Sequence, residues 1–265
     1  REISERMKVI DIVIELVDSR APYSSKNPML NDIINQKPRL IVLTKKDMSD
    51  DEKTKQWVHY YESIGYQAMS VNLKNFNEYQ KIIEKCRKVL KPKMDKEKAR
   101  GIKPRAIRAM VLGIPNVGKS TFINAYAGKN CAKTGNKPGV TKGKQWIRLN
   151  KNLELLDTPG VLWPKFDDQK IGMHLAFIGS MNDNILDVSE LAFQLIKLLE
   201  NLYPNAIKDR YSIEGDDNIL QIMYQIAEVR GCKLKGNQPD LDKTSKIVLD
   251  DFRSGKLGRI TLDRN

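Results

Sequence analysis

The stretch Gly113-Ile-Pro-Asn-Val-Gly-Lys-Ser120 decides the fold of this 265-residue chain. It matches the pattern G-x-x-x-x-G-K-[ST], whose glycines let successive backbone N–H groups wrap around a phosphate without side-chain clashes. The apolar run Ala106–Leu112 precedes it and predicts a strand. A helix is expected to follow and to direct its N-terminus at the anion. This order of strand, loop and helix indicates a phosphate-binding loop (P-loop) in an α/β protein.

The residue types in this loop indicate how a nucleotide would be held. Lys119 supplies a point charge to the β- and γ-phosphate oxygens, and the Ser120 hydroxyl is a ligand for Mg²⁺. The alternative interpretation is a glycine turn beside a lysine, which the flanking strand and helix argue against. We expect the nucleotide to be contacted here by Asn116, Val117, Gly118, Lys119, Ser120 and Thr121.

A second motif, Asp157-Thr-Pro-Gly160, begins 37 residues after Ser120, at the end of the expected strand Leu153–Leu156. Carboxylates at strand ends in P-loop proteins hold the Mg²⁺ shell, which assigns Asp157 to the metal. The backbone N–H of Gly160 is expected to contact the γ-phosphate, so that the following segment senses hydrolysis.

Thr141 lies between these two motifs, after Pro138 and Gly139, which favour a mobile loop. We expect it to ligate Mg²⁺ in the GTP state; the alternative is an ordinary loop threonine. The catalytic candidates are therefore Lys119, Thr141 and Gly160, and the Mg²⁺ ligands are Ser120, Thr141 and Asp157.

Upstream of the P-loop, Thr44-Lys-Lys-Asp47 ends the apolar strand Leu40–Leu43 and fits [NT]-K-x-D, a motif that reads guanine. The Asp47 carboxylate would accept hydrogen bonds from N1–H and N2–H₂, which adenine lacks in that form. The alternative is a capped helix start. Ser70-Val-Asn72 follows another short strand and resembles a second base loop. The expected base contacts are Thr44, Lys45, Lys46, Asp47, Ser70, Val71, Asn72 and Leu73.

The order of the motifs is itself informative, because an ordinary small GTPase has its P-loop first and its base motifs last. Here the base motifs come first, which predicts a circular permutation that begins near the strand Val9–Val17. The old ends would be joined through Leu90–Arg105, and Lys91–Arg105 is interpreted as a solvated linker or surface-crossing segment. A site made of strand-end loops survives such a rearrangement, since loop position and not chain order builds it.

The fold class expected is α/β. Residues 1–178 are predicted to form a circularly permuted P-loop GTPase domain with a doubly wound, mostly parallel sheet. Apolar stripes at helical spacing in Ile185–Leu202, Asn218–Val229 and Leu241–Phe252 predict a small all-α C-terminal domain over 179–265.

Composition narrows the class of partner. The formal net charge is +13, which favours association with nucleic acid or a ribonucleoprotein. The cysteines Cys86, Cys131 and Cys232 are scattered, so neither a disulfide framework nor a zinc site is indicated. No apolar run approaches the length of a membrane span, and a reducing cytoplasm fits.

With these motifs placed, the sequence resembles the circularly permuted ribosome-biogenesis GTPases of the YlqF/RbgA type. The resemblance covers residues 1 to about 180 and rests on Asp18-Ser-Arg-Ala-Pro22, Thr44-Lys-Lys-Asp47, Gly113–Ser120, Lys137-Pro-Gly-Val-Thr141 and Asp157-Thr-Pro-Gly-Val-Leu-Trp-Pro164. It implies GTP/GDP and Mg²⁺ as ligands, and a K⁺ ion beside Asn116. It also implies a cytoplasmic, non-membrane protein that is monomeric off the ribosome and binds rRNA in the large (50S) subunit or its precursor. Hydrolysis would be stimulated by that particle.

One departure concerns hydrolysis. Ras-like enzymes carry a water-orienting glutamine after D-x-x-G, whereas this chain has Val161, so intrinsic hydrolysis is expected to be slow. The resemblance places a histidine for this role before Arg1. Within the chain, His59 is expected at the surface, and His174 is a minor catalytic candidate.

Several alternatives stay open at this stage. The candidate rRNA contacts, which would otherwise be a solvated helix face, are Lys233, Lys235, Lys243, Lys246, Arg253, Lys256 and Arg259. A P-loop kinase would not need the base motifs. A GTPase acting on the small subunit or in tRNA modification, and a nucleotide-gated RNA-binding module, are the remaining readings of function.

Overall fold

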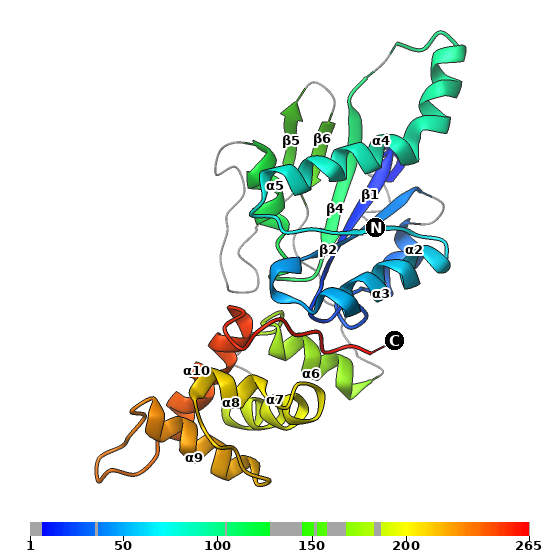
Figure 1. Ribbon diagram of the computed structural model, residues 1–265. Coiled ribbons are helices and arrows are strands. Elements are labelled where there is room, and N and C mark those ends of the chain that lie inside the picture. Colours follow the sequence, from blue (N-terminus) through cyan, green and yellow to red (C-terminus); the bar gives the residue numbers. More distant parts are fainter. Residues whose placement is uncertain are drawn as a thin grey trace.

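A computed structural model of the chain describes residues 7–34, 37–103, 105–127, 145–150, 153–157, 168–182 and 187–264. Its centre is a six-stranded sheet, in these ranges, with the order β3-β2-β1-β4-β6-β5 (Figure 1). The strands are β1 Ile12–Asp18, β2 Arg39–Thr44, β3 Gln67–Ser70, β4 Ile107–Gly113, β5 Gln145–Asn150 and β6 Leu153–Asp157. All neighbours pair in parallel except β5 and β6, which are antiparallel. The predicted α/β class with a mostly parallel sheet is confirmed.

The sheet is covered on both faces, as its continuously apolar strands require. In β1 every residue is buried, and alternate side chains point to opposite faces. Ile14 and Leu16 pack in the core beneath α4 (Phe76–Ala99) and α5 (Lys119–Ala127). On the other face, Val13 and Val17 pack against two smaller clusters formed with α2 (Leu30–Ile34) and α3 (Asp51–Ser63). The arrangement is doubly wound.

Strand order reverses between β1 and β4, which are neighbours in the sheet but far apart in the chain. From β1 the chain continues to β2 and β3 on one side, and β4 leads to β6 and β5 on the other. Ligands of open α/β sheets bind outside the carboxyl ends of the strands at such a reversal. Asp18 and Gly113 end these two strands, so this edge is where a ligand is expected.

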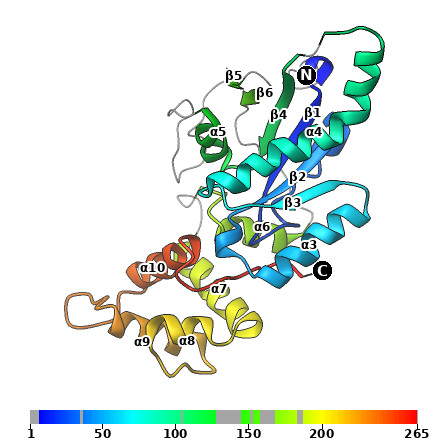
Figure 2. The same cartoon turned by 45° about the horizontal axis from the view of Figure 1, so that its top comes forward.

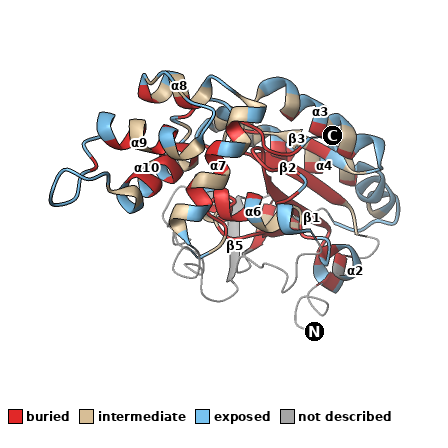
Figure 3. Ribbon diagram, turned by 90° about the horizontal axis from the view of Figure 1, so that it is seen from below, coloured by how far each residue is buried: buried red, intermediate tan, exposed pale blue. Residues whose placement is uncertain are grey.

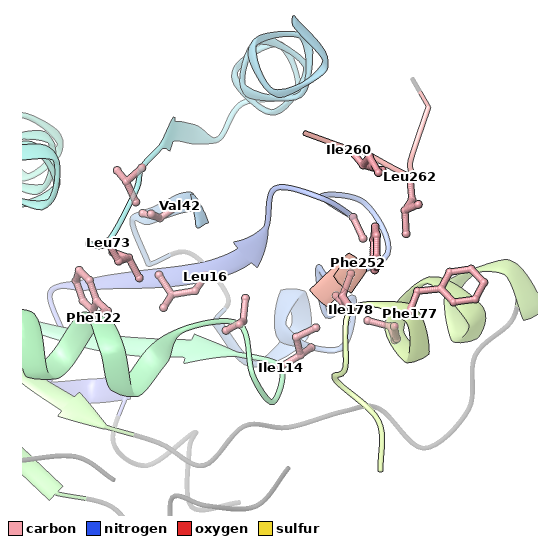
Figure 4. Close-up of a cluster of buried hydrophobic side chains, with 14 of the residues drawn as sticks. Leu16, Val42, Leu73, Ile114, Phe122, Phe177, Ile178, Phe252, Ile260 and Leu262 are labelled. Carbon is pink, nitrogen blue, oxygen red and sulfur yellow. The ribbon is translucent and has the colours of Figure 1, made fainter. Parts of the chain in front are cut away.

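Beyond this edge lies a group of helices (Figure 1): α6 Gln169–Phe177, α7 Val188–Leu202, α8 Ala206–Tyr211, α9 Ile219–Val229 and α10 Leu241–Arg253. The three apolar stripes seen in the sequence correspond to α7, α9 and α10. Their core is continuous with that of the sheet, and Figure 4 shows Ile178 and Phe252 in the same buried cluster as Leu16 and Phe122. The domain boundary between residues 178 and 179 stays a prediction.

The C-terminal tail, residues 257–264, leaves α10 and runs back along the carboxyl edge of the sheet toward α3 (Figures 1 and 2). The backbone N–H of Ile260 donates to Met48 O at 3.0 Å, and that of Leu262 donates to Arg20 O at 2.6 Å. The Asp263 carboxylate accepts hydrogen bonds from the N–H groups of Tyr23 and Ser24, both at 2.8 Å. The tail therefore joins the helical region to the loops that follow β1 and β2.

The segment Lys91–Arg105 is largely exposed, as expected, but most of it is not a linker, because α4 continues to Ala99. Pro92 lies inside this helix, although proline lacks an N–H and crowds the preceding turn. Two contacts favour continuation: Lys93 pairs with Glu97 one turn later and with Asp11 at the start of β1. The helices α2, α6 and α8 were not predicted from the sequence.

No helix within the described ranges combines the length and apolar character needed to cross a lipid bilayer.

Asp11, just before β1, links α4 and the start of β4 at the amino-terminal edge of the sheet. Its carboxylate accepts hydrogen bonds from the guanidinium of Arg105 at 2.7 and 2.8 Å, from the Arg108 backbone N–H at 2.9 Å and from Lys93. Burial alone would raise the pKa of Asp11, but the hydrogen bonds from Arg105 and Lys93 outweigh it and lower the pKa from 3.8 to about 2. The charged form is therefore stabilised by folding.

We expect Asp11→Asn to lower the free energy of unfolding at pH 7 by about 1–2 kcal/mol, since Lys93 and Arg105 are partly exposed and screened. A carboxyl with a depressed pKa stabilises the fold above its unfolded pKa and loses that contribution as pH falls. The difference between variant and parent should therefore shrink between about pH 4 and about pH 2. Urea unfolding at several pH values measures it, with Asp95→Asn on the exposed side of α4 as control. A difference that is constant with pH would show that the carboxylate is not the cause.

Candidate functional site

The loop between β4 and α5 has the backbone of a phosphate cradle. Gly118 has φ +106°, a conformation open to glycine, and Asn116 also lies in the left-handed region with φ +59°. A Cβ on Gly113 would stand 2.8 Å from Val117 Cγ1 and 3.0 Å from Leu16 O, so no side chain fits there. The loop is thus held close to the end of β1, with its concave side made of backbone.

Lys119 and Ser120 open α5 at this loop. The Phe122 N–H donates to Gly118 O at 2.9 Å, which fixes the first turn of the helix and leaves its N-terminus at the loop. Lys119 is buried, and its ammonium lies 3.5 Å from Gly113 O. A cation and a helix N-terminus beside this glycine-containing loop fit a polyphosphate.

The Thr44-Lys-Lys-Asp47 segment touches the P-loop directly. The Thr44 hydroxyl donates to Val117 O at 2.7 Å, and the Lys45 ammonium donates to Asn116 O at 2.8 Å. Lys45 adopts a left-handed backbone conformation with φ 56°, just before the 3-10 helix Lys46–Met48. Two segments about 70 residues apart in sequence therefore form one wall of the site.

The second expected base loop lies beside the first. The Lys46 N–H donates to Val71 O at 3.3 Å, which links the segments that follow β2 and β3. Leu73 packs on the P-loop, where its Cδ1 lies 3.2 Å from the position of a Cβ on Gly118. The structure thus brings together the residues around positions 45, 70 and 118.

Two further expected base contacts, Asp47 and Asn72, also have partners within the chain. The Asp47 carboxylate pairs with Lys74 at 3.3 Å in an exposed ion pair. The Asn72 N–H, an expected donor to the base, donates instead to Glu78 Oε2 at 2.6 Å. A base that enters here would exchange these contacts for its own.

The Mg²⁺ side of the site is described only in part. Asp157 ends β6, and its backbone pairs with Val111 of β4 and Gln145 of β5. This places the end of β6 on the same edge as the P-loop. Thr141, Gly160 and Val161 lie outside the described residues. Among the residues that are described, no cluster of three or more His, Cys, Asp or Glu side chains suits a metal ion.

Sequence reasoning missed the role of two residues in Asp18-Ser-Arg-Ala-Pro22. Asp18, buried at the end of β1, accepts hydrogen bonds from the Arg20 guanidinium and from Lys45, with the shortest at 2.8 Å. Burial would raise the pKa of Asp18, but the charges of Arg20 and Lys45 dominate and hold it well below the ordinary value. The motif was noticed as a family signature, but its contacts join elements that no local pattern connects.

A second missed contact comes from the segment after α6. The Asn116 side-chain amide donates to Gly179 O at 2.6 Å, and the Ser180 hydroxyl donates to Pro115 O at 2.9 Å. Nothing in the sequence around Gly179 signals this. The P-loop is therefore held from the helical region as well as from β1 and β2.

Some residues considered as catalytic or rRNA-binding candidates make contacts that support the fold. His174 is buried, and its Nδ1 lies 2.7 Å from Asp263 Oδ1 and 3.2 Å from Ser24 Oγ, so it anchors the tail and does not face the site. His59 is exposed on α3, as expected. Arg253 and Arg259, two of the candidate rRNA contacts, have partners within the chain. Arg253 donates to carbonyls at the end of α6, and Arg259 is engaged by Asp51 and by Ser49 O.

Comparison with known proteins shows to which family this chain belongs. Residues 108–223 match the model of a family described as 50S ribosome-binding GTPase. A protein of Bacillus cereus called ribosome biogenesis GTPase A is 49% identical over 264 residues, covering 99% of this chain and 89% of the relative. Its namesake in Bacillus licheniformis is 44% identical, covering 100% of this chain and 94% of the relative.

Two solved structures share the fold. A GDP-bound YlqF has a TM-score of 0.71 at 24% identity, covering 100% of this chain and 99% of that one. A GNP-bound YlqF from T. maritima has a TM-score of 0.69 at 24% identity, covering 100% and 97%. These likenesses show the fold and are consistent with the circular permutation predicted from the order of the motifs. On the strength of its full-length relatives, this chain is a guanine-nucleotide-hydrolysing enzyme that belongs to the ribosome biogenesis GTPase A family.

Proposed function

We propose that the chain binds GTP where the P-loop meets the two base loops, and that hydrolysis there controls when it acts as an assembly factor of the large ribosomal subunit. The observation that carries the binding proposal is the contact of Thr44 and Lys45 with the backbone of Val117 and Asn116. One purine nucleotide that spans this wall would touch both a phosphate loop and a base loop.

Each residue has a role in this proposal. Asp47 reads the guanine edge, and the aliphatic stem of Lys45 packs over the base. Backbone N–H groups of Val117–Thr121 and the Lys119 ammonium hold the phosphates. Ser120, Thr141 and Asp157 would hold Mg²⁺, which neutralises charge that develops on the phosphate oxygens. Gly160 would sense the γ-phosphate.

We extend the proposal to a K⁺ ion at Asn116. The Asn116 amide nitrogen donates to Gly179 O, which fixes this side chain beside the P-loop, and its amide oxygen is the acceptor atom that would ligate the cation. A monovalent cation there would supply the positive charge that an arginine finger supplies in other GTPases.

The proposed partner is the large subunit or its precursor, bound through rRNA, with hydrolysis stimulated by that particle. The names of the relatives and of the matched family support it, and so does the net charge of +13. We place the protein in the cytoplasm, and as a monomer off the ribosome, on the same resemblance.

The surface proposed for rRNA is smaller than the sequence indicated. Lys233 and Lys235 are exposed on the hairpin after α9, which Figure 3 shows as a projecting exposed loop, and Lys243 and Lys246 are exposed on α10. Leu234, 54% exposed between the two hairpin lysines, adds an apolar contact. Lys256 is weaker as a candidate, since it faces Asp251 at 3.5 Å.

The nucleotide state should change affinity for the particle. We expect the chain to bind 50S particles at least about ten-fold more tightly with a non-hydrolysable GTP analogue than with GDP, within the usual range of coupling between two sites. Sedimentation of the chain with 50S or 30S particles measures this. The double variant Lys233→Glu with Lys235→Glu should weaken binding, and Lys55→Glu with Lys88→Glu, on exposed sites of α3 and α4, is its control.

Equal affinity with both nucleotides would refute the timing role. Preference for the 30S particle would move the target to the small subunit. Stimulation by tRNA alone, with neither particle bound, would favour tRNA modification.

A further inference from the structure

The carboxylate of Asp18 sits at the centre of a buried set of charges beside the proposed base site. Asp18 Oδ1 accepts hydrogen bonds from Arg20 N–H at 3.0 Å and from Arg20 Nε at 2.9 Å. Its Oδ2 accepts from Arg20 Nη2 and from Lys45 Nζ, both at 2.8 Å. The side chains of Asp18 and Arg20 are 1% exposed, so these charges have no solvent to replace a lost partner.

Lys45 is held at three places. Its ammonium is fixed between Asp18 Oδ2 and Asn116 O, and its backbone is in the left-handed region, which non-glycine residues adopt at a cost. The surrounding contacts therefore determine where its aliphatic stem lies. That stem is the part of Lys45 proposed to pack over guanine, so Asp18 sets the position of a base contact without touching the base.

Arg20 connects this carboxylate to the end of α10. Its Nη1 donates to Arg253 O at 3.1 Å and to Phe252 O at 3.5 Å, and its guanidinium lies 5.4 Å from the centre of the Phe252 ring. The last carbonyls of a helix lack partners within the helix and carry the negative end of its dipole. Arg20 therefore caps α10 and neutralises Asp18 with the same side chain.

The other end of the connection returns to the P-loop. The Arg253 guanidinium donates to Ala176 O at 2.8 Å and to Phe177 O at 3.1 Å, which caps α6. Just beyond α6, Gly179 O accepts the Asn116 amide, and the Ser180 hydroxyl donates to Pro115 O. Polar contacts thus form a closed ring. It runs from Asn116 through Lys45, Asp18 and Arg20 to the end of α10, and from there through the end of α6 and Gly179 back to Asn116.

We propose that Asp18 and Arg20 are positioning residues for Lys45, and that through them the end of α10 and the guanine site are energetically coupled. The inference rests on the proposed guanine site. Displacement of α10 removes the Arg20 contacts, frees Asp18 and Lys45, and loosens the wall that faces the base. By linkage, a ligand that holds α10 in place strengthens nucleotide binding, and the nucleotide in turn steadies α10.

The test measures the affinity and dissociation rate of fluorescently labelled GDP. Asp18→Asn keeps the shape of the side chain and removes its charge. Arg20→Lys keeps the positive charge but removes the guanidinium group that contacts both Asp18 and the end of α10. Each should weaken GDP binding by about ten-fold, mainly through faster dissociation. Arg39→Lys is the matched control, because Arg39 is likewise buried and paired with a carboxylate, Glu15, but at the amino-terminal edge of the sheet.

A double-mutant cycle separates positioning from general loss of structure. If Asp18 acts through Lys45, then Asp18→Asn combined with Lys45→Ala should bind GDP no more weakly than Lys45→Ala alone. Losses that simply add would overturn the proposal. If Lys45→Ala itself leaves GDP affinity unchanged, the guanine site is wrong and the inference falls with it. If Lys45→Ala weakens binding but Asp18→Asn and Arg20→Lys do not, only the inference falls.

A second measurement needs no variant that risks misfolding. In the unaltered protein, GDP should slow hydrogen exchange of the backbone amides in residues 250–258, at the end of α10. Exchange there that is the same with and without GDP would overturn the coupling.

Discussion

Replacing Lys119 by alanine should reduce the single-turnover rate of GTP hydrolysis by about a hundred- to a thousand-fold, the range seen when one preorganised donor to a reacting centre is removed. Lys119 is 7% exposed, and its ammonium lies within the loop that follows β4, close to Gly113 O. In the proposed complex it is the positive side chain nearest the β- and γ-phosphates. A buried charge acts strongly on charge that develops beside it, since water does not screen it.

The measurement is phosphate release with enzyme in excess over GTP, with and without 50S particles. Lys88→Ala, on an exposed position of α4, should hydrolyse GTP at the parent rate. Thermal unfolding of the Lys119 variant, measured beside that of the parent, separates a loss of hydrolysis from a loss of folding. Hydrolysis at the parent rate in Lys119→Ala would exclude this loop as the phosphate site.

The second large effect expected is a change of base specificity in Asp47→Asn. The asparagine amide would present a donor where guanine also has donors, and the mismatch should weaken GDP binding by about a hundred- to a thousand-fold. Xanthine carries an oxygen in place of the guanine amino group and accepts a hydrogen bond from that amide. XDP should therefore bind the variant more tightly than GDP does.

Competition of GDP and XDP against a labelled nucleotide measures this exchange of preference. Asp51→Asn is the control, because Asp51 is an exposed carboxylate four residues away that pairs with Arg259 and not with the site. A variant at position 47 that loses all nucleotides equally would point to damage of the loop. One that keeps its preference for GDP would remove Asp47 from the base site.

Much of the fold could be predicted from local patterns in the sequence. Asp50 predicts the start of α3, because its carboxylate accepts hydrogen bonds from the backbone N–H groups of Glu52 and Lys53. The helix ends just before Gly65. The buried strands β1, β2 and β4 are short apolar runs bounded by polar loops. The P-loop could be predicted because phosphate geometry permits few residue types, and its neighbour β4 and helix α5 lie where the motif requires.

What could not be predicted depends on contacts between distant segments. Proline normally ends a helix, and the pairing of Lys93 with Glu97 and, across the sheet edge, with Asp11 favours the continuation of α4 past Pro92. The tail residue Asp263 is an ordinary polar residue in the sequence, yet it is 4% exposed and bound to His174. Arg253 looked like a surface cation and is a helix cap. A charged side chain reads the same in the sequence whether its partner is water, RNA or another helix.

The candidate site divides in the same way. Thr44, Lys45 and Lys119 were recognised by type and spacing, and the structure places the first two against the P-loop backbone. Their support by Asp18 was not recognised, because that carboxylate ends a different strand. Base and phosphate loops can be identified separately, but their contact follows from the order of strands in the sheet.

The central claim is that one pocket joins the base loops to the P-loop and therefore selects guanine. Calorimetric titration of the chain with GDP and with ADP, in the presence of Mg²⁺, tests it most directly. The account predicts clear saturable binding of GDP and at least about a thousand-fold weaker binding of ADP. Equal affinity for the two nucleotides would contradict it.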